Sequence, residues 1–177
     1  SEESESTAVI GMGVNNASKL QYVNSGKMGD NIYTRFSVST RETDGEHTNV
    51  YSNLKNVDFF EDTTLRGRIL VEEDDSSWDF RFGMSEASGG TINFNAVFAL
   101  PAFQGFGTPG ADQFFKDVNE HKFSYMFNVP PVNEQETSDL SIKYTEDLAS
   151  GREFSAIFAY NHLEEFLMYD GTSGAFG

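Results

Sequence analysis

The stretch LRGRILVEEDDSSWDFRFGM, residues 65–84, decides the fold class. Apolar residues recur at alternate positions in both halves: Leu65, Ile69, Val71, Trp78, Phe80, Phe82 and Met84. Charged residues stand between them: Arg66, Arg68, Glu72, Asp79 and Arg81. A period of two is typical of half-buried strands, and the polar run EEDDSS at 72–77 is typical of a turn. The stretch therefore predicts an antiparallel hairpin.

The same alternation recurs along the chain. It predicts further strands at 32–40, 91–100, 122–129, 140–146 and 152–160, with weaker candidates at 7–14 and 49–57. We expect turns at SEASGG (85–90) and DLASG (147–151), and a longer connection at 129–139 held by Pro130 and Pro131. Leu163, Phe166 and Leu167 have helical spacing and predict a short C-terminal helix.

These segments predict an all-β protein. About eight antiparallel strands, mixed hairpins and longer loops, and no internal repeat indicate a two-sheet sandwich of jelly-roll type. We expect one domain over residues 1–177, with a short N-terminal arm at 1–7 and a C-terminal tail at 171–177.

One segment suggests a cofactor. Gly105, Gly107 and Gly110 in GFGTPGADQFFKDV (105–118) have the spacing of a dinucleotide-binding loop. Such loops work inside a βαβ unit and bind phosphate through backbone N–H groups, whereas this chain is β-rich and Pro109 removes one N–H. We therefore expect no cofactor there, but a glycine-rich loop and a short helix near 111–118.

The charge of the chain is strongly negative. There are 28 acidic and 12 basic residues, which gives a net charge of −16. Such a charge disfavours direct contact with nucleic acid and is compatible with adaptation to high salt, where self-repulsion is screened. The absence of cysteine excludes disulfides, thiolate metal sites and a cysteine nucleophile.

No catalytic or metal site is predicted. His47, His121 and His162 lack metal-ligand spacing, and the acidic run Glu72–Asp75 is better explained as a solvated turn than as a cation site. Glu72, Asp79 and Glu153 fall at outward positions, which does not favour a glycosidase pair. We expect no enzyme activity.

The strand series from Ile32 to Tyr160, the acidic surface, the absence of cysteine and the GFGTPGADQFF segment resemble small single jelly-roll capsid proteins of membrane-containing icosahedral viruses of halophilic archaea. The resemblance implies a structural subunit of a virion, near a membrane without inserting into it. Its partners would be copies of itself and related capsid chains. The resemblance also implies that termini and loops contact neighbouring subunits, so we expect intersubunit contacts at Ser1, Glu2, Glu3, Phe106 and Phe176. The alternatives are a secreted or cell-surface β-sandwich module that binds carbohydrate or a matrix partner, and an extracellular filament subunit.

Overall fold

The computed structural model describes residues 3–49, 52–90 and 129–168. The described part is all-β and contains no helix. Its strands are β1 (Glu5–Met12), β2 (Ser18–Lys27), β3 (Ile32–Thr43), β4 (Thr48–Asn49), β5 (Leu54–Lys55), β6 (Phe60–Glu72), β7 (Ser76–Gly89), β8 (Val132–Leu148) and β9 (Arg152–Met168).

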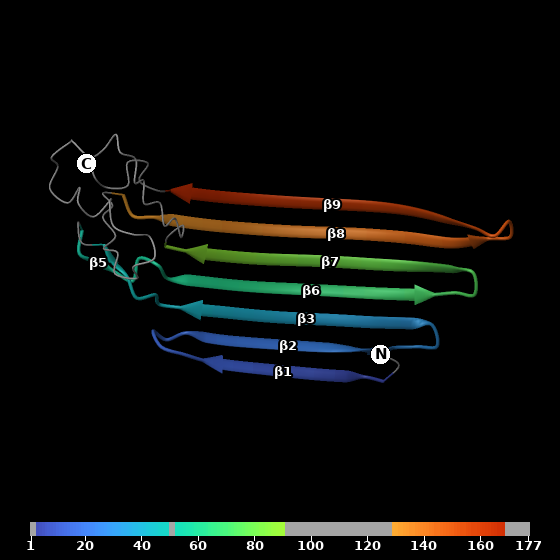
Figure 1. Ribbon diagram of the computed structural model, residues 1–177, viewed down its shortest axis with the longest axis horizontal. Coiled ribbons are helices and arrows are strands. Elements are labelled where there is room, and N and C mark those ends of the chain that lie inside the picture. The colour runs from blue at the N-terminus through green and yellow to red at the C-terminus, as the bar shows by residue number, and fades with distance from the viewer. Residues whose placement is uncertain (1–2, 50–51, 91–128, 169–177) are drawn as a thin grey trace, which may run out of the picture.

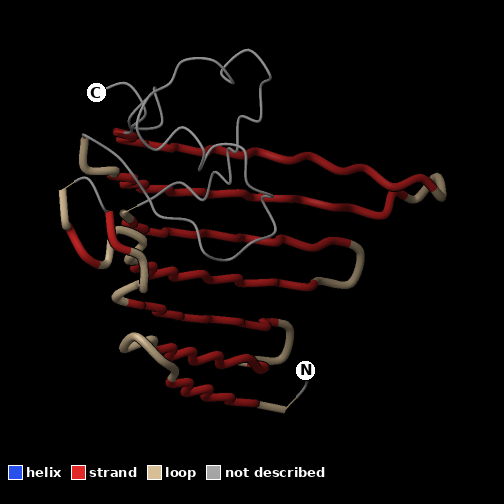
Figure 2. The backbone as a smooth tube through the Cα atoms, turned by 60° about the vertical axis from the view of Figure 1, so that its left-hand side comes forward, coloured by secondary structure: helices blue, strands red, loops and turns tan. Residues whose placement is uncertain are grey.

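Seven of these strands form one antiparallel sheet in the order β1-β2-β3-β6-β7-β8-β9 (Figure 1). Each strand pairs with the next one in the sheet by chain order, so the connectivity is up-and-down. β4 and β5, which lie between β3 and β6 in the sequence, form a separate two-stranded ribbon. Figure 2 shows the seven strands as one open layer, with the ribbon beyond one end of it.

The alternating segments that the structure describes are strands, as predicted. Segments 32–40, 65–73, 78–84, 140–146 and 152–160 lie in β3, β6, β7, β8 and β9, and segment 7–14 overlaps β1. The turn at 72–77 is confirmed, since β6 ends at Glu72 and the backbone N–H of Glu73 donates to the carbonyl of Ser76. The turn at 147–151 is also confirmed, with Gly151 at a φ of 74°.

Several expectations are wrong. The C-terminal helix at Leu163, Phe166 and Leu167 is part of β9, which continues to Met168. The turn expected at 85–90 is mostly strand, because β7 runs to Gly89, and most of the connection expected at 129–139 belongs to β8. The expected single strand at 49–57 is divided, because Asn49 ends β4 and Leu54–Lys55 form β5, and β1 begins at Glu5, inside the expected arm.

The two-sheet jelly roll is not confirmed. The large sheet is a single layer, and its strands follow one another without the crossover connections of a jelly roll. The expected strands at 91–100 and 122–129, the glycine-rich loop at 105–118 and the helix at 111–118 lie outside the described residues.

The register of the sheet separates two faces with different chemistry. We define the apolar face by residues that the pairing places on one side, here in order from β1 to β9: Ile10, Leu20, Tyr22, Ile32, Phe36, Val38, Leu65, Ile69, Val71, Trp78, Phe80, Phe82, Met84, Leu140, Ile142, Tyr144, Phe154, Phe158, Tyr160 and Phe166. The polar face is the opposite side. The one apolar core residue among those described is Val57, in the segment after β5 and not in the large sheet.

Candidate functional site

The apolar face is open to solvent over the described part of the chain. Ile10 is 72% exposed, Met84 59% and Phe158 60%, and most other large residues of this face are more than one-third exposed. A typical monomer has its largest apolar patch limited to a few hundred Å², and larger patches mark sites of interaction. The face is therefore the strongest candidate for a functional surface.

Aromatic rings line one part of this face. Trp78 lies between Phe80, with ring centroids 6.0 Å apart, and Tyr144, with centroids 4.6 Å apart. Tyr144 in turn contacts Phe154 on β9, at 6.4 Å. Edge-on and offset contacts at these distances stabilise aromatic pairs beyond the area they bury. The rings form a continuous row across β7, β8 and β9.

On the same side of the sheet, the end away from the aromatic row is acidic. Glu86 lies opposite Glu136, and Glu136 lies opposite Glu164, so three like charges stand side by side on β7, β8 and β9. Glu42 and Glu61 form a similar pair on β3 and β6. Like charges directly opposite each other destabilise a sheet. Part of the negative charge of the chain thus lies on the same side of the sheet as the apolar face.

The polar face contains an ion cluster around Asp79. Arg68 donates from Nε to Oδ1 and from Nη2 to Oδ2, at 2.8 and 3.0 Å, and Arg81 donates from Nε and Nη2 to Oδ2, at 3.0 and 2.6 Å. Asp79 is only 8% exposed. Burial alone raises the pKa of this carboxyl, but the hydrogen bonds and charges of Arg68 and Arg81 outweigh it and lower the pKa to about 2.

Strand β9 lies at the edge of the sheet and is exposed on both sides. Phe158 and Tyr160 belong to the apolar face, whereas Ile157 and Leu163 project from the opposite face and are 68% and 61% exposed. A long edge strand with apolar residues presents unpaired backbone groups that can pair with another chain. Figure 1 shows β9 as the outermost strand along its whole length.

The ribbon β4–β5 is held mainly by local polar contacts. The carboxylate of Asp58 accepts hydrogen bonds from the backbone N–H groups of Glu46 and His47, at 2.9 and 2.7 Å. His47 lies 3.9 Å from Asp58, and His162 lies 3.0 Å from Glu164. These contacts explain both described histidines as parts of local polar networks.

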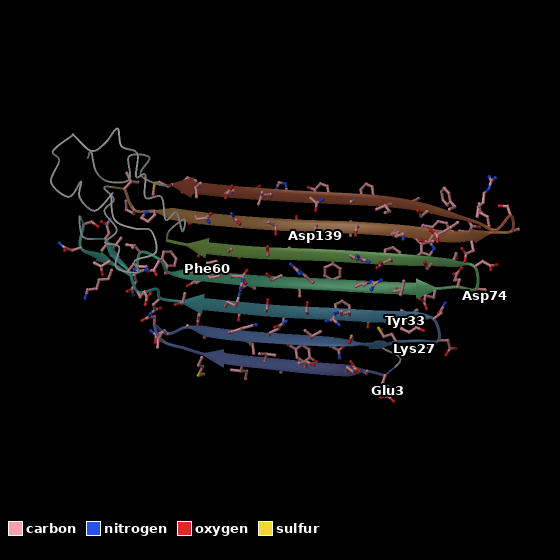
Figure 3. All side chains as sticks on the ribbon, viewed as in Figure 1. Glu3, Lys27, Tyr33, Phe60, Asp74 and Asp139 are labelled. Atoms are coloured by element: carbon pink, nitrogen blue, oxygen red, sulfur yellow. The ribbon has the colours of Figure 1, made fainter. Side chains whose placement is uncertain are left out.

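Of the expected intersubunit residues, the structure describes Glu3, which is exposed just before β1 (Figure 3). Ser1, Glu2, Phe106 and Phe176 lie outside the described residues. Asp74 marks the exposed β6–β7 turn in Figure 3, which contains the acidic run Glu72–Asp75. Among the described residues, no group of three or more His, Cys, Asp or Glu side chains is placed to hold a metal ion.

The sequence did not predict two features that depend on the pairing of strands, the ion cluster around Asp79 and the exposed apolar face. It placed Arg66, Arg68, Asp79 and Arg81 at outward positions but did not bring them into one cluster. It also did not detect that one side of seven strands stays exposed. The signal for both was present in the period of two, but the pairing of strands far apart in sequence had to be known.

A scan against models of protein families, a search of curated proteins and a search of solved structures each found no match. The part of the chain that the structure describes also has no helix long and apolar enough to cross a membrane.

Proposed function

We propose that the chain is a structural assembly subunit and that copies of it associate through the apolar face of the large sheet. The observation that carries this proposal is the exposure of that face along all seven strands. Burial of apolar surface is the dominant favourable term in most protein association. A protein in water gains free energy when such a face is covered.

Charge restricts how two copies can meet. Packed sheets lie about 10 Å apart with their side chains interdigitated. Glu86, Glu136 and Glu164 oppose any arrangement that stacks the acidic end of one copy on that of another. A two-fold axis that lies between the two sheets, perpendicular to the strands and near the aromatic rows, avoids this. The aromatic rows of the two copies then overlap, while their acidic ends point in opposite directions. The second copy also supplies the second sheet that a β-sandwich requires.

The finer form of the proposal is a viral shell subunit, as the sequence resemblance implies. An assembly larger than a dimer needs a second contact besides the apolar face, and the exposed edge of β9 offers one. A contact that closes on itself gives a shell, and one that does not close gives a filament.

The aromatic row favours one alternative, the carbohydrate-binding module. Trp78 and Tyr144 are flat rings with a polar group, the type that sugar-binding faces use. A module of this kind would bind a polysaccharide as a monomer and would lose that binding in Trp78→Ala.

Light scattering and electron microscopy of the full chain test the proposal. We expect particles larger than a monomer, in about 0.1 M and about 2 M NaCl alike, because apolar contacts survive screening. Closed shells would support the capsid form and open fibres the filament form. A chain that remains monomeric in both salts, with Trp78-dependent polysaccharide binding, would replace the proposal with the binding module.

A further inference from the structure

The polar face contains a compact group of three arginines and a serine on two neighbouring strands. The register places Arg35 of β3 opposite Arg68 of β6, and Ser37 of β3 opposite Arg66 of β6. The four side chains start from the corners of a rectangle about 5 Å across the strands and about 7 Å along them. All three arginines are exposed and Ser37 is half-buried.

Positive charge in this group exceeds negative charge. Arg68 also lies opposite Arg81, so three arginines stand side by side on β3, β6 and β7. Like charges in this arrangement repel one another. Asp79 compensates two of them, but Arg35 and Arg66 make no hydrogen bond or ion pair with any residue that the structure describes. The chain has only 12 basic residues, so four arginines close together on one face are more than a surface that only keeps the protein in solution would need.

Asp79 fixes the direction of one arginine. It accepts from Nε and Nη2 of Arg68, so Nη1 of that guanidinium keeps its hydrogen-bonding capacity. A guanidinium held in this way offers a rigid donor and loses little conformational entropy on binding an anion. Another carboxylate of this face, that of Asp139, lies over Gly83, which is opposite Arg66 on the side away from Ser37. It therefore borders the group without lying inside it.

We propose that Arg35, Arg66 and Arg68, with the hydroxyl of Ser37, bind a tetrahedral oxyanion group, phosphate or sulfate. Guanidinium groups match the oxygens of such groups bidentately, and charge-assisted hydrogen bonds are about twice as strong as neutral ones. The four oxygens of such a group point in different directions, so they can accept from three guanidinium groups and a hydroxyl at once, whereas the two oxygens of a carboxylate lie in one plane. The site lies on the opposite side of the sheet from the apolar face, so it is independent of the proposed assembly.

Thermal melts of the full chain in low millimolar phosphate, sulfate or acetate, with NaCl keeping the ionic strength constant, test the site. Phosphate and sulfate also stabilise proteins by exclusion from their surface, so the readout is the difference between variants. We expect a saturable rise of the melting temperature with phosphate and sulfate but not with acetate. The double variant Arg35→Gln/Arg66→Gln should bind at least tenfold more weakly.

The matched control is Lys19→Gln/Lys55→Gln, which removes two positive charges outside the group, because Lys19 lies opposite Arg41 and Lys55 lies in the ribbon β4–β5. It should retain the saturable rise, and Ser37→Ala should weaken it a few-fold. Circular dichroism verifies that each variant is folded. Equal responses of the two double variants, or an equal effect of acetate, would overturn the proposal.

A further arm with polyphosphate identifies the source of the ligand. An affinity per phosphate like that of the free ion supports binding of the ion itself. A much tighter affinity supports a phosphate group carried on a polymer. Neither result depends on the oligomeric state of the chain.

Discussion

Arg68 and Arg81 lie directly opposite each other on β6 and β7 and share the carboxylate of Asp79. Two guanidinium groups would repel one another in this position without the carboxylate. The triad therefore holds together two strands at the centre of the sheet. It also places a nearly buried negative charge where its removal leaves two cations facing each other.

Asp79→Asn should lower the free energy of unfolding by a few kcal/mol, since it leaves two arginines opposite each other without their shared carboxylate. Chemical denaturation at neutral pH measures this change. Asp62→Asn removes a carboxylate that pairs with the exposed Arg41 and is the control, for which we expect less than about 1 kcal/mol. Equal effects of the two substitutions would contradict the structural role of the triad.

The same carboxyl group gives a pH dependence. Its pKa falls from 3.8 in the unfolded chain to about 2 in the folded one, so its contribution is complete above the unfolded pKa and is lost as the pH falls through the folded pKa. A shift of this size corresponds to about 2 kcal/mol. Between pH 4 and about pH 2 the free energy of unfolding of the native chain should therefore fall by about 2 kcal/mol more than that of Asp79→Asn. If the free energy of unfolding fell equally with pH in the native chain and in Asp79→Asn, the lowered pKa of Asp79 would be contradicted.

Gly67 lies between Phe36 and Phe82, whose rings meet over it with centroids 6.2 Å apart. A Cβ at this position would collide with the ring of Phe82. Gly67→Ala should therefore displace the rings and cost about 1 kcal/mol, although alanine is the better strand residue. Gly11→Ala is the control, because its Cβ would make only ordinary contacts with Lys19. An unchanged or higher melting temperature for Gly67→Ala would show that the ring pair contributes nothing.

The row of Glu86, Glu136 and Glu164 predicts a response to salt. Screening shortens the Debye length to about 3 Å in 1 M salt, so the melting temperature should rise from about 0.1 M to about 2 M NaCl. Glu136→Gln removes the central charge and should add about 1 kcal/mol in low salt, with a smaller rise in high salt. Glu153→Gln, at the β8–β9 turn, should have little effect. A native chain whose melting temperature stays flat or falls with salt would remove the argument for adaptation to saline conditions.

The period of two was sufficient to predict the strands whose two sides differ in polarity. It failed for strands held mainly by their backbone ladders. Ser85–Gly89 and Asn133–Thr137 are small or polar on both sides, so their pattern is that of a turn or loop, yet they pair with each other throughout. β2 was missed because only Leu20 and Tyr22 alternate in it before Val23 breaks the pattern.

The C-terminal error has a different cause. Leu163, Phe166 and Leu167 have the spacing of a helix face, but Phe166 lies on one side of β9 and the two leucines on the other. A strand with apolar residues on both sides cannot be distinguished from a short helix by periodicity alone. The arginine group was equally hidden, because it depends on which strands are neighbours and in which register.

Sedimentation velocity of two matched variants tests the central claim most directly. Leu140→Glu/Phe158→Glu adds two charges to the apolar face on β8 and β9, and Ser141→Glu/Ala159→Glu adds the same charges to the polar face of the same strands. With both variants folded by circular dichroism, the account predicts that the first sediments as a monomer while the second assembles like the native chain. A native chain that sediments as a monomer at every concentration and salt, or an apolar-face variant that assembles as well as the polar-face one, would contradict it.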